Sequence, residues 1–252
     1  MKRIISLLTA ISILMPTASV VYAEDKPETA SEYNIIEGEQ LFFEDFEGEN
    51  PDSNYFPSGL FMTEMSTNGT KALHIRGLSQ NIATNRFGPE LDNYLVEADV
   101  KTSGCNASTN GGFFISARKT SNTSPSYNLL YTDVNTYNFE TKLWNSAENV
   151  RDSLLITRSR GSANVANSWF WTKMSNNETG LLDRNSRSFS DFAHFKFYMS
   201  DTFIRCEIYT MSGDLITSIQ QMTDEVDTIA GNNGNALARI EKGSIQLGAH
   251  VN

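Results

Sequence analysis

Residues 41–47 read Leu-Phe-Phe-Glu-Asp-Phe-Glu, a short aromatic stretch bounded by acidic residues. Aromatic residues are enriched in β-strands, and the stretch stands between a polar segment and a long series of similar short runs. We interpret it as the first strand of an antiparallel β-sandwich. Alternation along that strand places Phe43, Asp45 and Glu47 on one face, opposite Phe46.

The chain downstream is a series of short strands separated by clusters of Gly, Asn, Ser and Asp. The clearest pair, 193–199 and 203–209, is joined by Ser200-Asp201-Thr202 as a tight hairpin. No segment carries a sustained helical period, and residues 136–151 have the composition of an irregular loop. The other predicted strands are 71–76, 93–101, 113–119, 127–134, 153–158, 169–174, 214–220 and 244–251. The pattern predicts an all-β fold, a two-sheet antiparallel β-sandwich over residues 40–252.

The N-terminus has the three parts of a signal peptide. Lys2 and Arg3 are followed by an apolar run over 4–15 and by Val21-Tyr22-Ala23. We therefore expect residues 1–23 to be removed on export, 24–39 to form a polar leader, and the protein to be secreted, extracellular or on the cell surface. No later segment is apolar enough to cross a bilayer, so no membrane insertion is expected after cleavage.

The chain is acidic, with a formal net charge of −10. Loss of Lys2 and Arg3 with the signal peptide makes it −12, that is −10 − 2. Phosphate binding relies on clustered Lys and Arg, so this balance argues against a nucleic-acid partner. It suits a protein that handles neutral polymers or cations.

The two cysteines are Cys105 and Cys206. Export permits a disulfide between them, which would close a loop of about 100 residues. Cys206 lies in the alternation Ile204-x-Cys206-x-Ile208, so a small buried thiol is the alternative. Two cysteines alone do not decide between these.

The order of strands is that of a known fold family. The stretches that carry the likeness are LFFEDFEG (41–48), KALHIRG (71–77), NYLVEADVKTSG (93–104), GGFFISARK (111–119), FAHFKFYMSDTFIRCEIY (192–209) and GSIQLGAH (243–250). Together they resemble the concanavalin A-like, laminin G-like jelly roll of secreted bacterial proteins. The resemblance covers about residues 40–252. It implies a closing strand rich in Asp and aliphatic residues, and no stretch before Asn252 matches it. We therefore expect the sequence to be a fragment and the module to be part of a larger protein, with natural absence of that strand as the alternative.

Proteins of this group include carbohydrate-binding modules, glycoside hydrolases, polysaccharide lyases and adhesive surface modules. The glycosidases carry a pattern resembling E-x-D-x-x-E, and Glu97, Asp99 and Thr102 stand at its three positions. Alternation puts Glu97 and Asp99 on one face of a strand, as a nucleophile and an acid require. Thr102 cannot serve as the third carboxylate. The alternative is a solvated strand face with Lys101 as a neighbouring counter-charge.

Many such jelly rolls hold a structural calcium near the first strand, and Ca²⁺ prefers several carboxylate oxygens. Asp45 and Glu47 are the candidate ligands, and acidic residues exposed to water are the alternative. No cofactor is required. The three histidines show no zinc-ligand spacing, and no Gly-x-Ser-x-Gly elbow, P-loop or dinucleotide fingerprint occurs.

Binding of a glycan uses aromatic rings that stack on sugars and polar groups that fix the hydroxyls. The candidate ligand-binding residues are Trp144, Tyr137, Tyr131, Trp171, Arg118 and Arg158. Buried aromatics of the core and exposed arginines without a ligand are the alternatives. We expect an exported, non-catalytic carbohydrate-binding or surface-interaction module whose partner is a polysaccharide or glycan. A glycoside hydrolase or polysaccharide lyase of the same fold and an adhesive domain with a protein partner remain alternatives.

Overall fold

A computed structural model shows how these stretches fold. It describes residues 40–47, 54–56, 61–65, 69–75, 82–102, 111–138, 143–160, 169–175, 177–183, 185–186, 188–231 and 235–251. The predicted signal peptide and leader lie outside these residues. Within the described part of the chain, no helix has the length and apolar character needed to cross a membrane.

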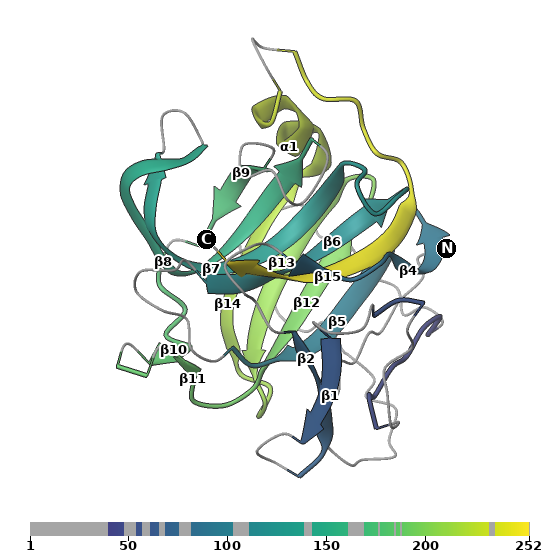
Figure 1. The fold of residues 1–252 in the computed structure, drawn as a ribbon. Coiled ribbons are helices and arrows are strands. Elements are labelled where there is room, and N and C mark those ends of the chain that lie inside the picture. The colour runs from purple at the N-terminus through teal and green to yellow at the C-terminus, as the bar shows by residue number, and fades with distance from the viewer. Residues whose placement is uncertain are drawn as a thin grey trace.

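Two antiparallel sheets form the body of the molecule (Figure 1). The four-stranded sheet has the order β14 (Leu215–Met222), β13 (Phe203–Thr210), β12 (Ala193–Met199) and β5 (Tyr94–Val100). The seven-stranded sheet has the order β3 (Ile82–Ala83), β15 (Gly243–Val251), β6 (Gly111–Lys119), β7 (Ser126–Asn138), β8 (Leu143–Ser159) and β9 (Trp169–Met174), with β4 (Phe87–Leu91) also paired to β15.

Three smaller elements complete the description. Two short antiparallel pairs are β1 (Phe61–Met65) with β2 (Lys71–Ile75), and β10 (Leu182–Asp183) with β11 (Ser188–Phe189). The helix α1 (Thr223–Ile229) lies at one end of the sandwich, and the β1–β2 hairpin projects at the other end (Figure 1).

One hydrophobic core fills the space between the two large sheets. Val96 and Ala98 of β5 and Phe195 and Phe197 of β12 point inward. From the seven-stranded sheet they meet residues that include Ile115, Leu129, Ile156 and Ile245. Each fully buried side chain of this size contributes about 1.5–3 kcal/mol. The chain crosses between the sheets from β4 to β5, from β5 to β6, from β9 to β12 and from β14 to β15. The predicted two-sheet antiparallel jelly roll is therefore confirmed.

The opening stretch is not the strand that we predicted. Around residues 41–47 only isolated bridges form, at Gln40 and Glu44. The Glu44 carboxylate accepts the N–H of Phe46, and the Asp45 carboxylate accepts the N–H of Glu47. Such local bonds compete with a sheet ladder. They accompany a left-handed backbone at Phe46 (φ 56°), which turns this buried ring into the core.

Two further segments differ from the sequence analysis. Residues 136–151, predicted as a loop, are largely strand, because β7 runs to Asn138 and β8 begins at Leu143. The helix α1 was missed because it has only seven residues and no side-chain cap. Its buried residues Val226 and Asp227 hold it against the sandwich. A helix of about two turns that depends on such contacts is too short to leave a clear periodic signal.

Candidate functional site

The outward side of the four-stranded sheet carries a set of ionisable side chains on three neighbouring strands, which we call the charged face. Strand pairing sets Asp99 opposite His194 and Glu97 opposite Lys196, and it sets Lys196 opposite Glu207. The charged face comprises Glu97, Asp99, His194, Lys196, Arg205, Glu207 and Tyr209. Directly opposite residues of antiparallel strands have side chains in contact range, so register alone brings these charges together.

His194 is held between the two carboxylates that we singled out in the sequence. Its Nδ1 lies 2.7 Å from Oδ1 of Asp99 and its Nε2 lies 3.3 Å from Oε1 of Glu97. Burial alone would lower the pKa of His194, but the hydrogen bonds and negative charges of Asp99 and Glu97 outweigh it and raise the pKa from 6.5 to about 9. At neutral pH the imidazole is therefore charged and donates from both nitrogens.

The second cation of this face is Lys196. Its Nζ lies 3.1 Å from Oε1 of Glu97, and 5.4 Å from the centre of the Tyr209 ring. Both Lys196 and Glu97 are nearly inaccessible to water. A buried ion pair needs such additional partners, because each charge has lost its hydration.

Arg205 and Tyr209 are more accessible than the buried Glu97, Lys196 and Glu207. Tyr209 donates its hydroxyl to Oε2 of Glu207 at 2.9 Å, and Arg205 lies 3.6 Å from Oε1 of the same carboxylate. The Nε of Arg205 also donates to Gln220 at 2.7 Å. Burial and the negative charge of Glu207 raise the pKa of Tyr209, so its hydroxyl stays protonated. The side chains of His194 and Arg205 are 23% and 24% exposed, so both can be reached by a ligand.

These contacts bear on the predicted catalytic pair. A retaining glycosidase needs one free carboxylate as nucleophile and one carboxylic acid that gives its proton to the leaving group. Here Glu97 is bonded to His194 and Lys196, and Asp99 is bonded to His194. The third position of the pattern is Thr102, whose carbonyl accepts the N–H of Phe189. The arrangement is that of an ion-paired network with fixed donors and acceptors.

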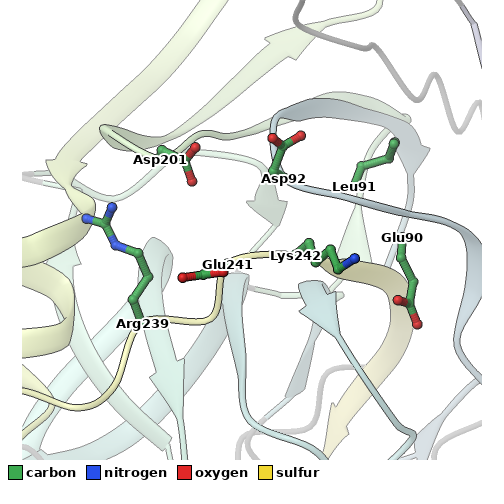
Figure 2. Close-up of a pocket in the computed structure, with 7 residues that line it drawn as sticks. All are labelled: Glu90, Leu91, Asp92, Asp201, Arg239, Glu241 and Lys242. Atoms are coloured by element: carbon green, nitrogen blue, oxygen red, sulfur yellow. The ribbon is translucent and has the colours of Figure 1, made fainter.

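A cavity of about 620 Å³ lies at one end of the sandwich, and we call it the end pocket. Its lining comes from the end of β4, the β4–β5 turn, the β12–β13 turn and the segment before β15 (Figure 2). Arg239 is paired with Asp224, and Glu90 with Arg86 at 2.6 Å. The lining residues are Glu90, Leu91, Asp92, Asp201, Arg239, Glu241 and Lys242.

Arg118 lies behind this pocket rather than on a ligand-binding surface. It is fully buried, and its guanidinium donates to the carbonyl groups of Asp92 and Ile240 and pairs with Asp201 at 2.7 Å. The residue has a left-handed backbone (φ 57°), and the β6–β15 pairing slips beside it, between Ser244 and Gln246. A β-bulge of this kind redirects a side chain, which alternation alone cannot predict.

Arg158 is also buried, in a network that fastens α1. It pairs with Asp227 at 3.0 Å and donates to the carbonyl of Ala238. Tyr127 donates its hydroxyl to the same Asp227 carboxylate, and its ring lies 4.7 Å from the Arg158 guanidinium and 5.9 Å from that of Arg118. The structure thus gathers the two arginines around one tyrosine, where they hold the segment before β15.

Tyr131 is buried as well and faces the core. Its ring stacks on Phe113 and meets Phe189 edge-on, and its hydroxyl bonds to Asp152. In the prediction, Tyr131, Arg118 and Arg158 face a ligand; in the structure all three bond to protein groups inside the fold.

The other predicted residues divide between described and undescribed positions. Tyr137, Trp144 and Trp171 belong to β7, β8 and β9, and their side chains lie outside what the structure describes. Cys105 also lies outside the described residues, whereas Cys206 is a free buried thiol. Burial, with the negative charge of Glu207, raises the pKa of Cys206.

The predicted calcium ligands sit in the opening stretch. The Glu47 carboxylate accepts the N–H of Lys71 at 3.0 Å, and the Asp45 carboxylate accepts the N–H of Glu47. Among the described residues, no group of three or more His, Cys, Asp or Glu is arranged to hold a metal ion. A structural calcium at Asp45 and Glu47 stays a prediction.

The sequence patterns pointed to Glu97 and Asp99 of the charged face, but not to Glu207 or to the cations. His194 and Lys196 alternate with Phe195 and Phe197, so their outward direction could have been read from the hairpin. Their pairing with Asp99 and Glu97 joins strands about 95 residues apart, and no local pattern encodes that register.

Comparison with known proteins adds fold similarity only. No protein-family model and no curated protein matches the chain. Sheep galectin-11 in complex with glycerol is 7% identical, with a TM-score of 0.33 over 69% of this chain and 94% of that chain. The κ-carrageenase of Pseudoalteromonas carrageenovora in complex with an oligotetrasaccharide of κ-carrageenan is 9% identical, with a TM-score of 0.33 over 67% of this chain and 54% of that chain.

A third similar structure is the catalytic domain of an endo-1,3-β-glucanase (laminarinase) from Thermotoga petrophila. It is 12% identical, with a TM-score of 0.36 over 80% of this chain and 69% of that chain. At these identities and TM-scores, the three similarities say nothing about the ligand or the activity of this chain.

Proposed function

We propose that this protein is an exported, non-catalytic carbohydrate-binding or surface-interaction module, and that its ligand is a polysaccharide or glycan. The proposed site is the accessible part of the charged face, formed by Arg205, Tyr209 and the ring of His194, with the nearly buried carboxylate of Glu207 bonded to the first two. Export rests on the signal-peptide pattern of residues 1–23.

The observation that carries the proposal is the arrangement of donors beside acceptors on one rigid sheet. A sugar hydroxyl both donates and accepts hydrogen bonds, so a site for it needs both kinds of group at fixed positions. Arg205 supplies N–H groups, and Glu207 and Tyr209 supply oxygens, whereas both N–H groups of His194 are already bonded to Asp99 and Glu97. Their mutual bonds hold these side chains before a ligand arrives, which reduces the entropy lost on binding.

The non-catalytic part of the proposal is supported by the bonds of Glu97 and Asp99. Both carboxylates already neutralise His194, and Glu97 also neutralises Lys196. Neither stands free to attack a sugar, and no third carboxylate follows them at residue 102. A glycoside hydrolase or polysaccharide lyase is the alternative, with Glu97 and Asp99 as its acid and nucleophile.

Affinity electrophoresis of the chain from residue 24 onward, through gels that contain neutral polysaccharides, tests the proposal. We expect at least one polysaccharide to retard the protein, and Arg205→Ala to weaken that retardation about tenfold. Arg239→Ala is the matched control, because it removes an arginine from the end pocket and leaves the charged face intact. Retardation lost in Arg239→Ala and kept in Arg205→Ala would place the site at the end pocket instead.

Measurement of reducing ends over the same polysaccharides separates the two classes of function. The non-catalytic proposal predicts no release by the wild type. Release that disappears in Glu97→Gln, with the fold retained, would establish the hydrolase and end the non-catalytic proposal.

A further inference from the structure

We propose that the edge strand β14 pairs with β14 of a second copy of this chain, so that two four-stranded sheets join into one continuous sheet. The four-stranded sheet ends at β14, and within the described residues no strand pairs with β14 on the side away from β13. Such an edge presents unpaired N–H and C=O groups, which form a template for another strand.

The edge β14 lacks three of the devices by which proteins protect sheet edges, namely short length, charged side chains and proline, and its one register irregularity is confined to the start of the strand. Its eight residues, Leu-Ile-Thr-Ser-Ile-Gln-Gln-Met, include no charge and no proline. The other edges of the two large sheets each carry such a device. β3 has two residues, β4 contains Pro89, β5 contains Glu97 and Asp99, and β9 contains Lys173.

Charge favours a second copy at this place. The whole chain has a formal net charge of −10, so two copies repel each other overall. Because β14 itself has no charged residue, two copies that approach along this strand do not bring like charges of the strand together. A register irregularity lies at the start of the strand, near Leu215 and Thr217, and residues 217–221 pair regularly with β13.

The strand is also complementary to itself. In an antiparallel pair centred on Ile219, Ser218 of each copy lies opposite Gln220 of the other, and Thr217 lies opposite Gln221. These pairs combine a short polar side chain with a long one on the same face of the sheet. A two-fold axis perpendicular to the sheet relates the copies, as a self-complementary interface requires.

The hairpin that leads into β14 carries exposed apolar side chains. Met211 is 42% exposed and Leu215 is 56% exposed, and they are two of the three exposed large hydrophobic residues among those described. Both lie at the start of the unpaired edge, so a second copy that pairs along β14 brings its own surface close to them.

Pairing of this kind places both charged faces on the same side of the joined sheet. The proposed axis keeps outward residues outward, so Arg205 and its neighbours recur on the second copy in one plane. Two sites on one surface would raise the avidity for a polymer with repeated units. The pairing itself stands independently of the proposed function.

Sedimentation equilibrium of the chain from residue 24 onward tests the pairing. We expect a dimer in the wild type, and a dissociation constant about tenfold higher in Ser218→Lys and in Ser218→Glu, because two like charges then lie diagonally across the axis, on the same face and within reach of these long side chains. An equimolar mixture of the two variants should restore the dimer, since the two diagonal charges are then opposite in sign. Thermal unfolding establishes that both variants fold.

Ser121→Lys and Ser121→Glu are the matched controls, because Ser121 is exposed in the β6–β7 turn, away from the edge. They should dimerise as the wild type does. A wild-type monomer at every concentration up to about 1 mM would overturn the proposal. So would a dimer that both Ser218 variants leave unchanged.

Discussion

His194 makes the stability of the fold depend on pH in a direction that the structure determines. Its pKa is raised from 6.5 to about 9 by Asp99 and Glu97, against the effect of burial. A histidine with a raised pKa in the folded state stabilises the fold fully below its unfolded pKa. That stabilisation is lost as the pH rises from 6.5 through about 9.

The size of the effect follows from the same rise in pKa. From 6.5 to about 9 it corresponds to about 3 kcal/mol, at about 1.4 kcal/mol per pKa unit. The imidazole is 23% exposed, so solvent screening makes this an upper value. His194→Gln keeps a side chain of similar size and removes the titration.

Urea unfolding followed by tryptophan fluorescence, at steps between pH 6 and about 9.5, measures the effect. The wild type should lose up to about 3 kcal/mol relative to His194→Gln over this range. Lys119, whose pKa burial lowers to about 8, adds stability as the pH rises, but it does so in both proteins and cancels in their difference. Arg239→Gln, in the end pocket, is the control, because it leaves Asp99, Glu97 and His194 in place, and it should show the pH dependence of the wild type. Parallel pH curves for the wild type and His194→Gln would refute the reasoning.

Three further perturbations have defined outcomes. Asp227→Ala leaves Arg158 buried without its carboxylate, and urea unfolding should show a loss of about 3–5 kcal/mol; a loss below about 1 kcal/mol would contradict the buried pair. Gly243→Ala places a Cβ against the backbone of Arg118, so the melting temperature of this variant should fall. In the control Gly69→Ala the new Cβ meets open space, so any loss of stability reflects only the backbone strain at a φ of 86°. Cys206, buried and with a raised pKa, should resist alkylation in the native protein and react in urea, as peptide mass spectrometry can show.

The sequence predicted most of the strands because their alternation is local. The hairpin of β12 and β13 carries its inward phenylalanines and its turn within one continuous stretch, so its bounds could be predicted closely. The opening stretch has the same aromatic character, yet Glu44 and Asp45 bond to the backbone beside them and the strand does not form. An aromatic-rich composition therefore predicts that a segment packs against the core more reliably than it predicts that the segment pairs with a neighbouring strand.

The site was less predictable because it depends on register and on bulges. Alternation put Glu97 and Asp99 on one face, and the structure agrees. The cations that pair with these carboxylates, His194 and Lys196, lie on β12. Their position opposite Asp99 and Glu97 follows only from the register between β5 and β12. Because Arg118 is a charged residue near the end of a predicted strand, we expected its side chain to be exposed and able to bind a ligand. Its left-handed backbone instead directs the side chain inward, where the guanidinium donates to the carbonyl of Ile240.

The most direct test of the central claim is an NMR titration of the protein with the oligosaccharide of a polysaccharide that retards it. We expect chemical-shift changes centred on His194, Arg205, Glu207 and Tyr209, with the signals of Arg239 and Lys242 in the end pocket unchanged. Changes confined to the end pocket, or none on β12 and β13 at saturation, would contradict the assignment of the charged face as the binding site.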